Sequence, residues 1–353
     1  MQLWVRVVAT LVGAGVAGWS CAQWHTPLPW MIGPLLLTAL ASISGLPTAS
    51  WTPLRNVGQW VIGTALGLYF TPQVTALVLG LWWAIALGIV WALALGLGFG
   101  AWLHRIHAPR MPHVSPAVMR ATTYFAGAIG GASEMTLLAE RVGARTDLVA
   151  AAHSLRLLVV VVTIPFGLQA SGLTGIDLTP AGPKLVDAGG LLILLAAAGV
   201  GGWVMQRLGR ANPWFMGALV AAMGISMAGI TLSAIAPELS NIGQLVIGVS
   251  LGVRFRADFL HTAPRWLGSV ALGTVVMMVV CAGFGWLLAR GTGLHPVTLL
   301  LGTSPGGIAE MSITAKVLHL GVPVVTAFQV CRLVAVLVLT YPLWRWLERR
   351  APQ

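Results

Sequence analysis

Long apolar stretches recur along the whole chain, and they restrict its fold more than any other feature. A helix needs about 20 mostly apolar residues to cross the hydrocarbon core of a bilayer. Only 8% of the residues are charged and the mean hydropathy is +0.87, whereas a soluble domain carries about 25% charged residues. We therefore expect an all-α polytopic membrane protein, with the lipid bilayer as its surroundings. The predicted spans are about 3–22, 28–47, 55–71, 75–103, 148–169, 186–206, 213–235, 241–255, 265–289 and 323–347.

The formal net charge of +11 is spread along the chain rather than gathered in one basic surface. Basic residues stand in ones, twos and threes between apolar segments, which is typical of membrane flanks and not of a nucleic-acid interface. Too few charges are present to coat a soluble domain of this size. We therefore expect no soluble enzyme, no DNA-binding regulator and no nucleic-acid partner.

The chain repeats itself, and the repeat predicts the architecture. The segment 56–67 (NVGQWVIGTALG) returns as 241–252 (NIGQLVIGVSLG) with eight identities in twelve positions. Three further matches keep the same order: AGVAGW at 14–19, PWMIGPL at 29–35 and GGASEM at 130–135 return as AGVGGW, PWFMGAL and GGIAEM. We predict two membrane repeats, 1–178 and 185–353, joined by a linker at 179–184.

The distribution of basic residues favours an inverted relation between the two repeats. If the Gly-Gly stretches at about 118–140 and 297–318 cross the membrane, the basic residues divide ten against eight between its sides. If each stretch enters and returns, fifteen lie on one side and three on the other, as the positive-inside rule requires. Each repeat is therefore predicted to hold five transmembrane helices plus one re-entrant or broken-helix element. Both termini are expected in the cytoplasm and the protein in a bacterial-type inner membrane.

The two Gly-Gly elements are the predicted binding site. Inverted repeats with broken helices near the midplane are a recurrent architecture of secondary transporters. Glycine permits positive φ and close backbone approach, and the helix that follows such a break begins with free N–H groups that can hold an anion. The alternative is that the glycines only allow tight helix packing. The glycines concerned are Gly130, Gly131, Gly306 and Gly307.

Each Gly-Gly element carries one acid and is followed by an arginine, and both residues recur 176 positions later in the second repeat. Glu134 and Glu310 can carry a proton or bind a cation, because a carboxylate at membrane depth is by default functional. Alternatively, each glutamate caps its half-helix. Arg156 and Arg332 can bind an anionic substrate or pair with the matching glutamate, or they reach out to the interface.

Two amide pairs complete the candidate residues. Asn56 with Gln59, and Asn241 with Gln244, lie one helical turn apart on short spans. They either face a cavity or hold helices together through hydrogen bonds. The sequence predicts no catalytic residues, metal or cofactor: Cys21, Cys281 and Cys331 form no CxxC, and neither a Walker A loop nor a G-x-S-x-G nucleophile occurs.

These residues resemble a known family. The segment 27–35 (PLPWMIGPL), Asn-Val-Gly-Gln at 56–59 and the two G-G-x-x-E-M stretches resemble the AbrB-type membrane duplication family over essentially the whole chain. Its members carry labels such as "AbrB family transcriptional regulator" or "ammonia monooxygenase". The family is similar to the cation:proton antiporter and anion transporter superfamily, which implies a carrier.

The residues and the resemblance together predict a secondary transporter of a small solute, coupled to protons or sodium, and not an enzyme. The alternative is a membrane component with an indirect role in gene expression, and a membrane monooxygenase is a distant third. Whether the chain forms a homo-oligomer stays open.

Overall fold

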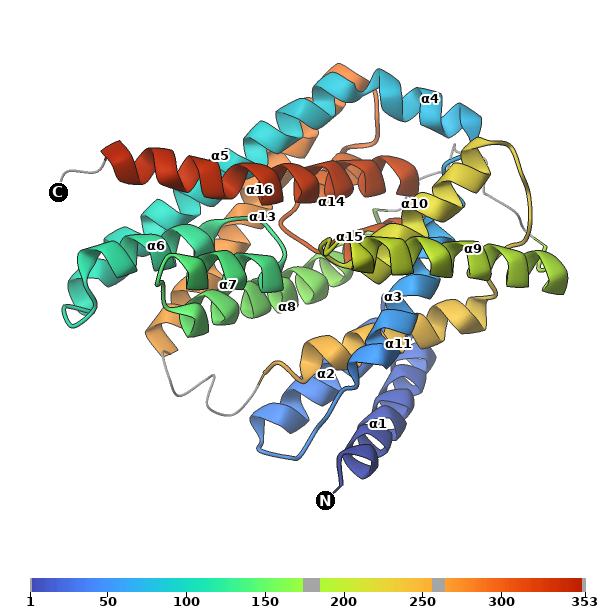
Figure 1. Ribbon diagram of the computed structural model, residues 1–353, viewed down its shortest axis with the longest axis horizontal. Helices are drawn as coiled ribbons and strands as arrows, with labels where there is room; N and C mark the ends of the chain where they lie inside the picture. The colour runs from blue at the N-terminus through green and yellow to red at the C-terminus, as the bar shows by residue number, and fades with distance from the viewer. Residues whose placement is uncertain (1, 174–184, 256–263, 351–353) are drawn as a thin grey trace. The chain divides into compact units, whose positions relative to one another are not determined.

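The computed structural model describes residues 2–173, 185–255 and 264–350, and the regular elements of this part of the chain are all helices (Figure 1). The predicted linker at 179–184 lies outside the described residues. Six described helices are long and apolar enough to cross a membrane. They are α1 (Leu3–Gln23), α5 (Trp82–His107), α8 (Thr146–Ala170), α9 (Ala188–Arg207), α13 (Pro264–Thr292) and α16 (Val322–Arg350).

Lipid-facing surface is visible on these long helices. Only 17% of the apolar window of α1 and 22% of that of α9 is buried. Trp19 on α1 and Trp203 on α9 are both more than half exposed. Apolar side chains that face outward over a whole helix mark a membrane surface in a folded chain. The polytopic membrane class is confirmed.

Four helices at predicted spans are short for a bilayer crossing. The helices α2 (Pro29–Ile43) and α10 (Pro213–Met227) have 15 residues, and α3 (Thr52–Gly67) and α11 (Pro237–Gly252) have 16. At 1.5 Å per residue, a helix of this length is about 23 Å long, against a hydrocarbon core of about 30 Å.

The predicted span 75–103 is wrong, because two helices share it. The first, α4 (Pro72–Gly80), ends at Gly80, and α5 begins at Trp82. α4 lies at 87° to α3, from which it is separated by four residues, so these two form either a broken span or a re-entrant loop. The sequence did not signal this break, because both α4 and α5 are apolar and no charge marks the junction.

The chain forms two compact units, and each takes helices from both sequence repeats. Unit 1 is Met1–Gly80, Ile164–Leu260 and Ser312–Pro323, and it holds α1 to α4 and α9 to α11. Unit 2 is Leu81–Thr163, His261–Met311 and Val324–Gln353. It holds α5, most of α8, α13, most of α16 and two pairs of short helices. The first pair is α6 (Pro116–Gly127) with α7 (Ala132–Arg141), and the second is α14 (Pro296–Thr303) with α15 (Ile308–Val317). The part of α15 after Met311 belongs to unit 1.

Helix packing inside unit 1 is duplicated. α1 packs on α2 as α9 packs on α10, and α2 packs on α11 as α3 packs on α10. Small residues make this close packing possible. A Cβ on Gly63 of α3 would overlap the carbonyl of Phe215 on α10, and a Cβ on Gly248 of α11 would overlap that of Met31 on α2.

The two repeats meet at a pair of equivalent glycines. A Cβ on Gly58 of α3 would lie 2.9 Å from the carbonyl oxygen of Gly243 on α11, and the reverse distance is 3.2 Å. These glycines occupy the same position in the repeated segments 56–67 and 241–252. α3 and α11 therefore cross where the duplicated sequences coincide, as two related copies would around a local twofold axis.

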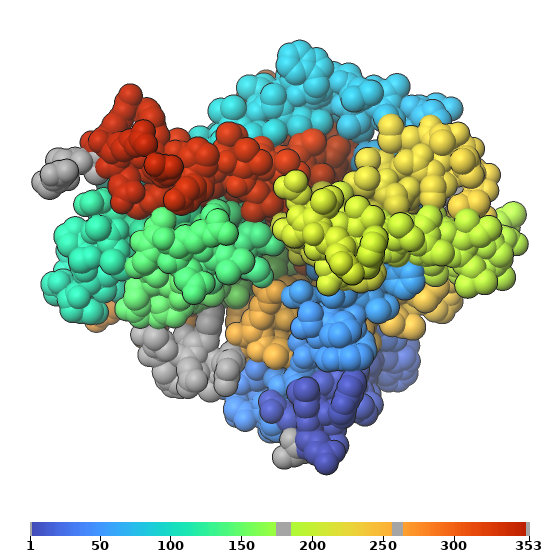
Figure 2. Space-filling model, viewed as in Figure 1, coloured from blue at the N-terminus to red at the C-terminus, as the bar shows by residue number. Residues whose placement is uncertain are grey.

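Unit 2 is held together by hydrogen bonds between helices distant in sequence. The Tyr124 hydroxyl on α6 donates to the Thr340 carbonyl on α16 at 2.7 Å, and the Trp266 indole on α13 donates to the Leu148 carbonyl on α8 at 3.1 Å. Figure 2 shows α16 and the segment of α6 and α7 side by side on the surface of this unit. The first of these hydrogen bonds fixes α6, the first half of one broken element, against α16.

Candidate functional site

Both Gly-Gly elements are broken helices, and the backbone breaks in the same way in each. α6 ends at Gly127 and α7 begins at Ala132, while α14 ends at Thr303 and α15 begins at Ile308. The residues that follow the first halves, Ala128 (ψ 136°) and Ser304 (ψ 149°), are both extended. Each break therefore leaves free carbonyl groups on one side and free N–H groups on the other.

The Gly-Gly pairs are explained by space and not by left-handed backbone. Gly131 has a φ of −67°, and none of the four glycines is among the described residues with positive φ, so that part of the expectation is wrong. A Cβ on Gly131 would overlap the carboxylate of Glu134, and a Cβ on Gly130 would press on Met135.

The second break repeats this arrangement. Gly307 lies against the carboxylate of Glu310 and Gly306 against the side chain of Met311. The G-G-x-x-E-M motif is thus a packing unit in which the first glycine makes room for methionine and the second for glutamate. Both glutamates stand third in their half-helices, where a capping-box glutamate stands. Glu310 is buried with 7% exposure, whereas Glu134 is half-buried.

Each arginine reaches back across its own break to backbone carbonyls. Arg156 donates from Nη2 to the Ala128 oxygen at 2.9 Å, with longer contacts of 3.4 Å from Nη1 to Ala126 and Gly127. Arg332 donates from Nη1 to the Ser304 oxygen at 2.5 Å and from Nη2 to the Gly306 oxygen at 2.7 Å. The guanidinium groups satisfy carbonyls that the broken helices leave free, and a cation there also opposes the negative end of the helix dipole.

Both arginines are deeply buried, at 3% and 6% exposure. They therefore do not reach out to the membrane interface. The two positive charges also lie near enough within unit 2 to repel each other. Arg332 keeps one polar atom without a hydrogen-bond partner, the buried Nε. Unit 2 thus places two buried guanidinium groups at the breaks, and because a buried charge is costly unless partners compensate it, an anion or a carboxylate beside them would be stabilised.

Two further polar side chains belong to the breaks, and the sequence reasoning missed them. His153 lies one turn before Arg156, and its Nε2 is 2.9 Å from the Phe125 carbonyl. Gln329 lies one turn before Arg332, and its Nε2 donates to the Leu301 carbonyl at 2.6 Å. The pairs 153/329 and 125/301 are each separated by 176 residues, like the arginines. A polar residue at both equivalent positions was the signal that could have identified them.

The amide pairs lie in the other compact unit. Gln59 on α3 donates from Nε2 to the Asn212 Oδ1 at 3.5 Å, at the start of α10. Asn56, Asn241 and Gln244 are half-buried on α3 and α11, on either side of the glycine crossing. Of the twelve candidate residues, unit 2 thus brings together the glycines, glutamates and arginines, and unit 1 contains the four amides.

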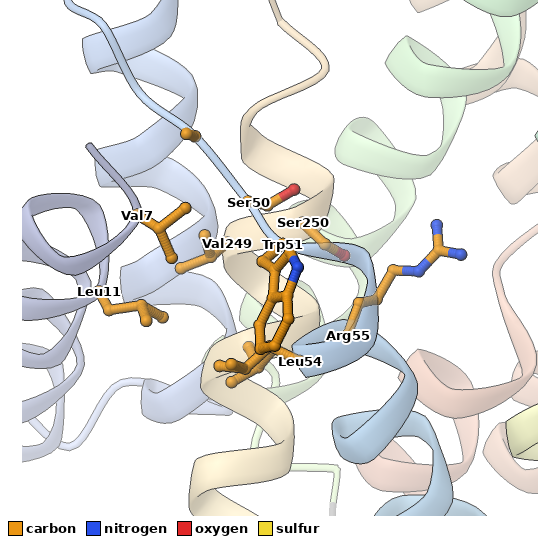
Figure 3. A pocket seen from close by; sticks show the side chains of 10 residues that line it. Val7, Leu11, Ser50, Trp51, Leu54, Arg55, Val249 and Ser250 are labelled. Carbon is orange, nitrogen blue, oxygen red and sulfur yellow. The ribbon is translucent and has the colours of Figure 1, made fainter. Parts of the chain in front are cut away.

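Small voids accompany both units. In unit 1 a cavity of about 10 Å³ lies between α1, α3 and α11, where Figure 3 shows Trp51 among Leu54 and Val249, with the Arg55 guanidinium turned away. In unit 2 a void of similar size is lined by Ala128 and Ile129 of the first break, by Tyr124 and by residues of α5 and α16. Each has room for about one water molecule, so neither holds a solute as it stands.

Comparisons with known proteins identify the family of this chain. A family model described as "Transition state regulatory protein AbrB" matches residues 30–348. The chain is 25% identical over 346 residues to "Uncharacterized protein YhjN" of Bacillus subtilis (strain 168), covering 90% of this chain and 87% of that protein. It is 25% identical over 339 residues to "Putative regulator AbrB" of Escherichia coli (strain K12), covering 93% and 92%. Since the family model covers most of this helical, membrane-type chain, the protein belongs to the AbrB family.

Proposed function

We propose that the protein is a secondary transporter of a small solute, coupled to a proton or sodium gradient. The observation that carries this proposal is the pair of broken helices in unit 2. Each combines free helix ends with a glutamate and a buried arginine. Non-helical backbone at membrane depth is tolerated where it is buried in protein or lines a water-filled path, and transporters use such breaks to bind substrates and ions.

The charges of the breaks favour an anionic solute. Two buried guanidinium groups lie within range of each other's charge, and the N-termini of α7 and α15 add the positive ends of two half-helices. The glutamates supply the opposite charge, which suits a proton or a cation that travels with the solute. In this proposal the protein is a carrier and not an enzyme.

The test is gradient-driven flux in proteoliposomes with a panel of small organic anions. If the glutamates bind the coupling ion, the double variant Glu134→Gln, Glu310→Gln should insert normally and lose its dependence on the gradient, because Gln keeps the size but cannot titrate. Glu140→Gln on the exposed face of α7 is the matched control and should transport normally. Unchanged coupling in the double variant would reduce both glutamates to helix caps.

The same proposal places the protein in a bacterial-type inner membrane with both termini in the cytoplasm. This orientation follows from the fifteen basic residues that the inverted arrangement gathers on one side. Its partners are the lipid bilayer and the solute, with no nucleic acid. A homo-oligomer is compatible with the large exposed apolar surface, for example along α1.

An indirect role in gene expression is the second candidate, and the name of the Escherichia coli relative favours it. A carrier can change transcription by moving a signalling solute. A strain that carries the Glu134→Gln, Glu310→Gln double variant distinguishes the two functions, because the carrier proposal expects this variant to lose coupled transport. Expression changes that disappear with transport support the carrier, whereas changes that persist support a regulator that acts through a bound partner.

A further inference from the structure

We infer that His153 is a proton-binding switch for the first break, and that the second break lacks one because Gln329 takes the equivalent place. This inference deepens the proposed function by assigning a proton site outside the glutamates. It is carried by the hydrogen bonds that join His153 to Arg156 and to the backbone of α6.

The partners of His153 fix its protonation in this structure. Nε2 lies 2.9 Å from the Phe125 carbonyl, and Nδ1 lies 2.7 Å from Nη2 of Arg156. A carbonyl oxygen only accepts and a guanidinium only donates, so Nε2 carries the hydrogen and Nδ1 offers its lone pair. The imidazole is therefore neutral, and the same Arg156 nitrogen that it holds also donates to the Ala128 carbonyl.

A proton on Nδ1 is incompatible with this arrangement. The incoming proton would take the lone pair that now accepts from Arg156, so the Arg156–His153 hydrogen bond breaks and the site gains one positive charge. The N–H groups of His153 Nδ1 and Arg156 Nη2 would then face each other without an acceptor, close to the positive charge of Arg332. Relief requires Arg156 to move away, which releases the Ala128 carbonyl and opens the first break. The void lined by Ala128 and Tyr124 has room for about one water molecule at this break.

Other charged groups do not replace this effect. The neighbouring elements carry these charged and titratable side chains: Arg120 and Tyr124 on α6; Glu134, Glu140 and Arg141 on α7; Arg265, Cys281 and Arg290 on α13; and Cys331, Arg332, Tyr341, Arg345, Glu348, Arg349 and Arg350 on α16. On α8 itself, Asp147 is paired with Arg145 at 2.6 Å. Among the described residues, Arg156 is the charge that acts on the His153 imidazole, and Arg332 acts in turn on Arg156.

The second break provides the comparison. Gln329 donates from Nε2 to the Leu301 carbonyl, as His153 donates to the equivalent Phe125 carbonyl, and also to Ser304 at 3.3 Å. An amide cannot take up a proton in this pH range. One break is therefore sensitive to protons and the other is not. In the closed form of the first break, His153 accepts a hydrogen bond from Arg156 and binds no extra proton, whereas in the open form it can bind one. The population of the closed form therefore falls as the pH falls.

The experiment measures opening without any solute. A cysteine is placed at the break by Ala128→Cys in the purified full-length chain, after replacement of Cys21, Cys281 and Cys331. Its rate of modification by N-ethylmaleimide is measured from pH 7.5 to pH 5.0, with and without His153→Gln. The ratio of the two rates at each pH removes the pH dependence of the thiol itself. Gln329 shows that glutamine can make the same backbone hydrogen bond, so the substitution conserves the link to Phe125.

We expect this ratio to rise by up to about 30-fold between pH 7.5 and pH 5.0, the limit set by an open-state histidine with an ordinary pKa of about 6.5. A converse variant, Gln329→His with the reporter Ser304→Cys, should give the second break a similar pH dependence. A ratio that stays flat overturns the inference. If His153→Gln does not fold, nitrogen NMR of the labelled imidazole tests the premise instead: we expect a neutral ring with its hydrogen on Nε2 at pH 7.5, and a hydrogen on Nδ1 overturns the inference. Failure of solute flux leaves these readouts unaffected, so the two proposals fail separately.

Discussion

The glycine that precedes each half-helix leaves room for one particular carboxylate. We predict that Gly307→Ala lowers the stability of the purified protein by about 1–3 kcal/mol, because the new Cβ overlaps the Glu310 carboxylate and the side chain must move. Thermal unfolding in detergent measures the loss. Gly98→Ala on α5, where nothing lies within 4 Å, is the control and should be neutral or slightly stabilising.

A double variant checks the cause of that loss. In a Glu310→Ala background, Gly307→Ala should cost clearly less, because the overlapping carboxylate is gone. An equal loss in both backgrounds would mean that the glycine is required for another reason.

The contribution of Arg332 to stability depends on the planar geometry of its guanidinium group as well as on its charge. Its two terminal nitrogens bind the Ser304 and Gly306 carbonyls separately, whereas a lysine ammonium on a flexible stem does not reproduce that geometry. We predict that Arg332→Lys costs about 1–3 kcal/mol through an unsatisfied buried carbonyl, again measured by thermal unfolding. Arg345→Lys, at an exposed position of the same helix, should have little effect. Equal stability of the two variants would contradict the carbonyl-binding role.

At the scale of elements, the close helix pairs of unit 1 depend on equivalent glycines. We predict that Gly63→Ala and Gly248→Ala are destabilising to a similar degree, about 1–3 kcal/mol each, because both would force a Cβ into a backbone carbonyl of the facing helix. Gly224→Ala on α10 meets no atom within 4 Å and serves as the control. Unfolding in detergent compares the three, and a strong effect of only one of the pair would argue against duplicated packing.

The broken elements depend on helices that follow them in the chain. α8 supplies His153 and Arg156 to the end of α6, and α16 supplies Gln329 and Arg332 to the end of α14. Each break is thus stabilised by side chains about 25 to 30 residues later, and in the second break the Ser304 hydroxyl adds a local hydrogen bond to the Leu301 carbonyl at 3.2 Å. The conformation of each break therefore depends on the packing of the long helix, α8 or α16, that supplies these side chains.

At the scale of the whole molecule, the inverted arrangement predicts the sides on which equivalent helix ends lie. Single cysteines at Glu140 and Val317, exposed near the ends of α7 and α15, are introduced into a chain without its native cysteines. A membrane-impermeant thiol reagent should label Glu140→Cys from the cytoplasmic side and Val317→Cys from the opposite side. Neither substitution removes a basic residue, so the charge bias stays intact. Labelling of both from one side would contradict the inverted arrangement.

The membrane class, the positions of most long helices and the two interruptions at the Gly-Gly pairs could be predicted from the amino-acid sequence alone. Apolar length, missing charge and glycine are local properties, and the duplication of 56–67 as 241–252 could be identified without coordinates. The junction at Leu81 could not, because apolar residues on both sides of it conceal a change of direction.

The contacts of the buried polar residues could be identified only from the folded chain. From spacing alone, Arg156 was equally compatible with an anion, a glutamate or the interface, and His153 received no role. Their partners are backbone carbonyls some 28 residues earlier in the chain. Every residue has a carbonyl, so the sequence does not show which ones a fold leaves unpaired. That depends on where the helices break and which span packs against the break, and both follow from contacts between distant segments.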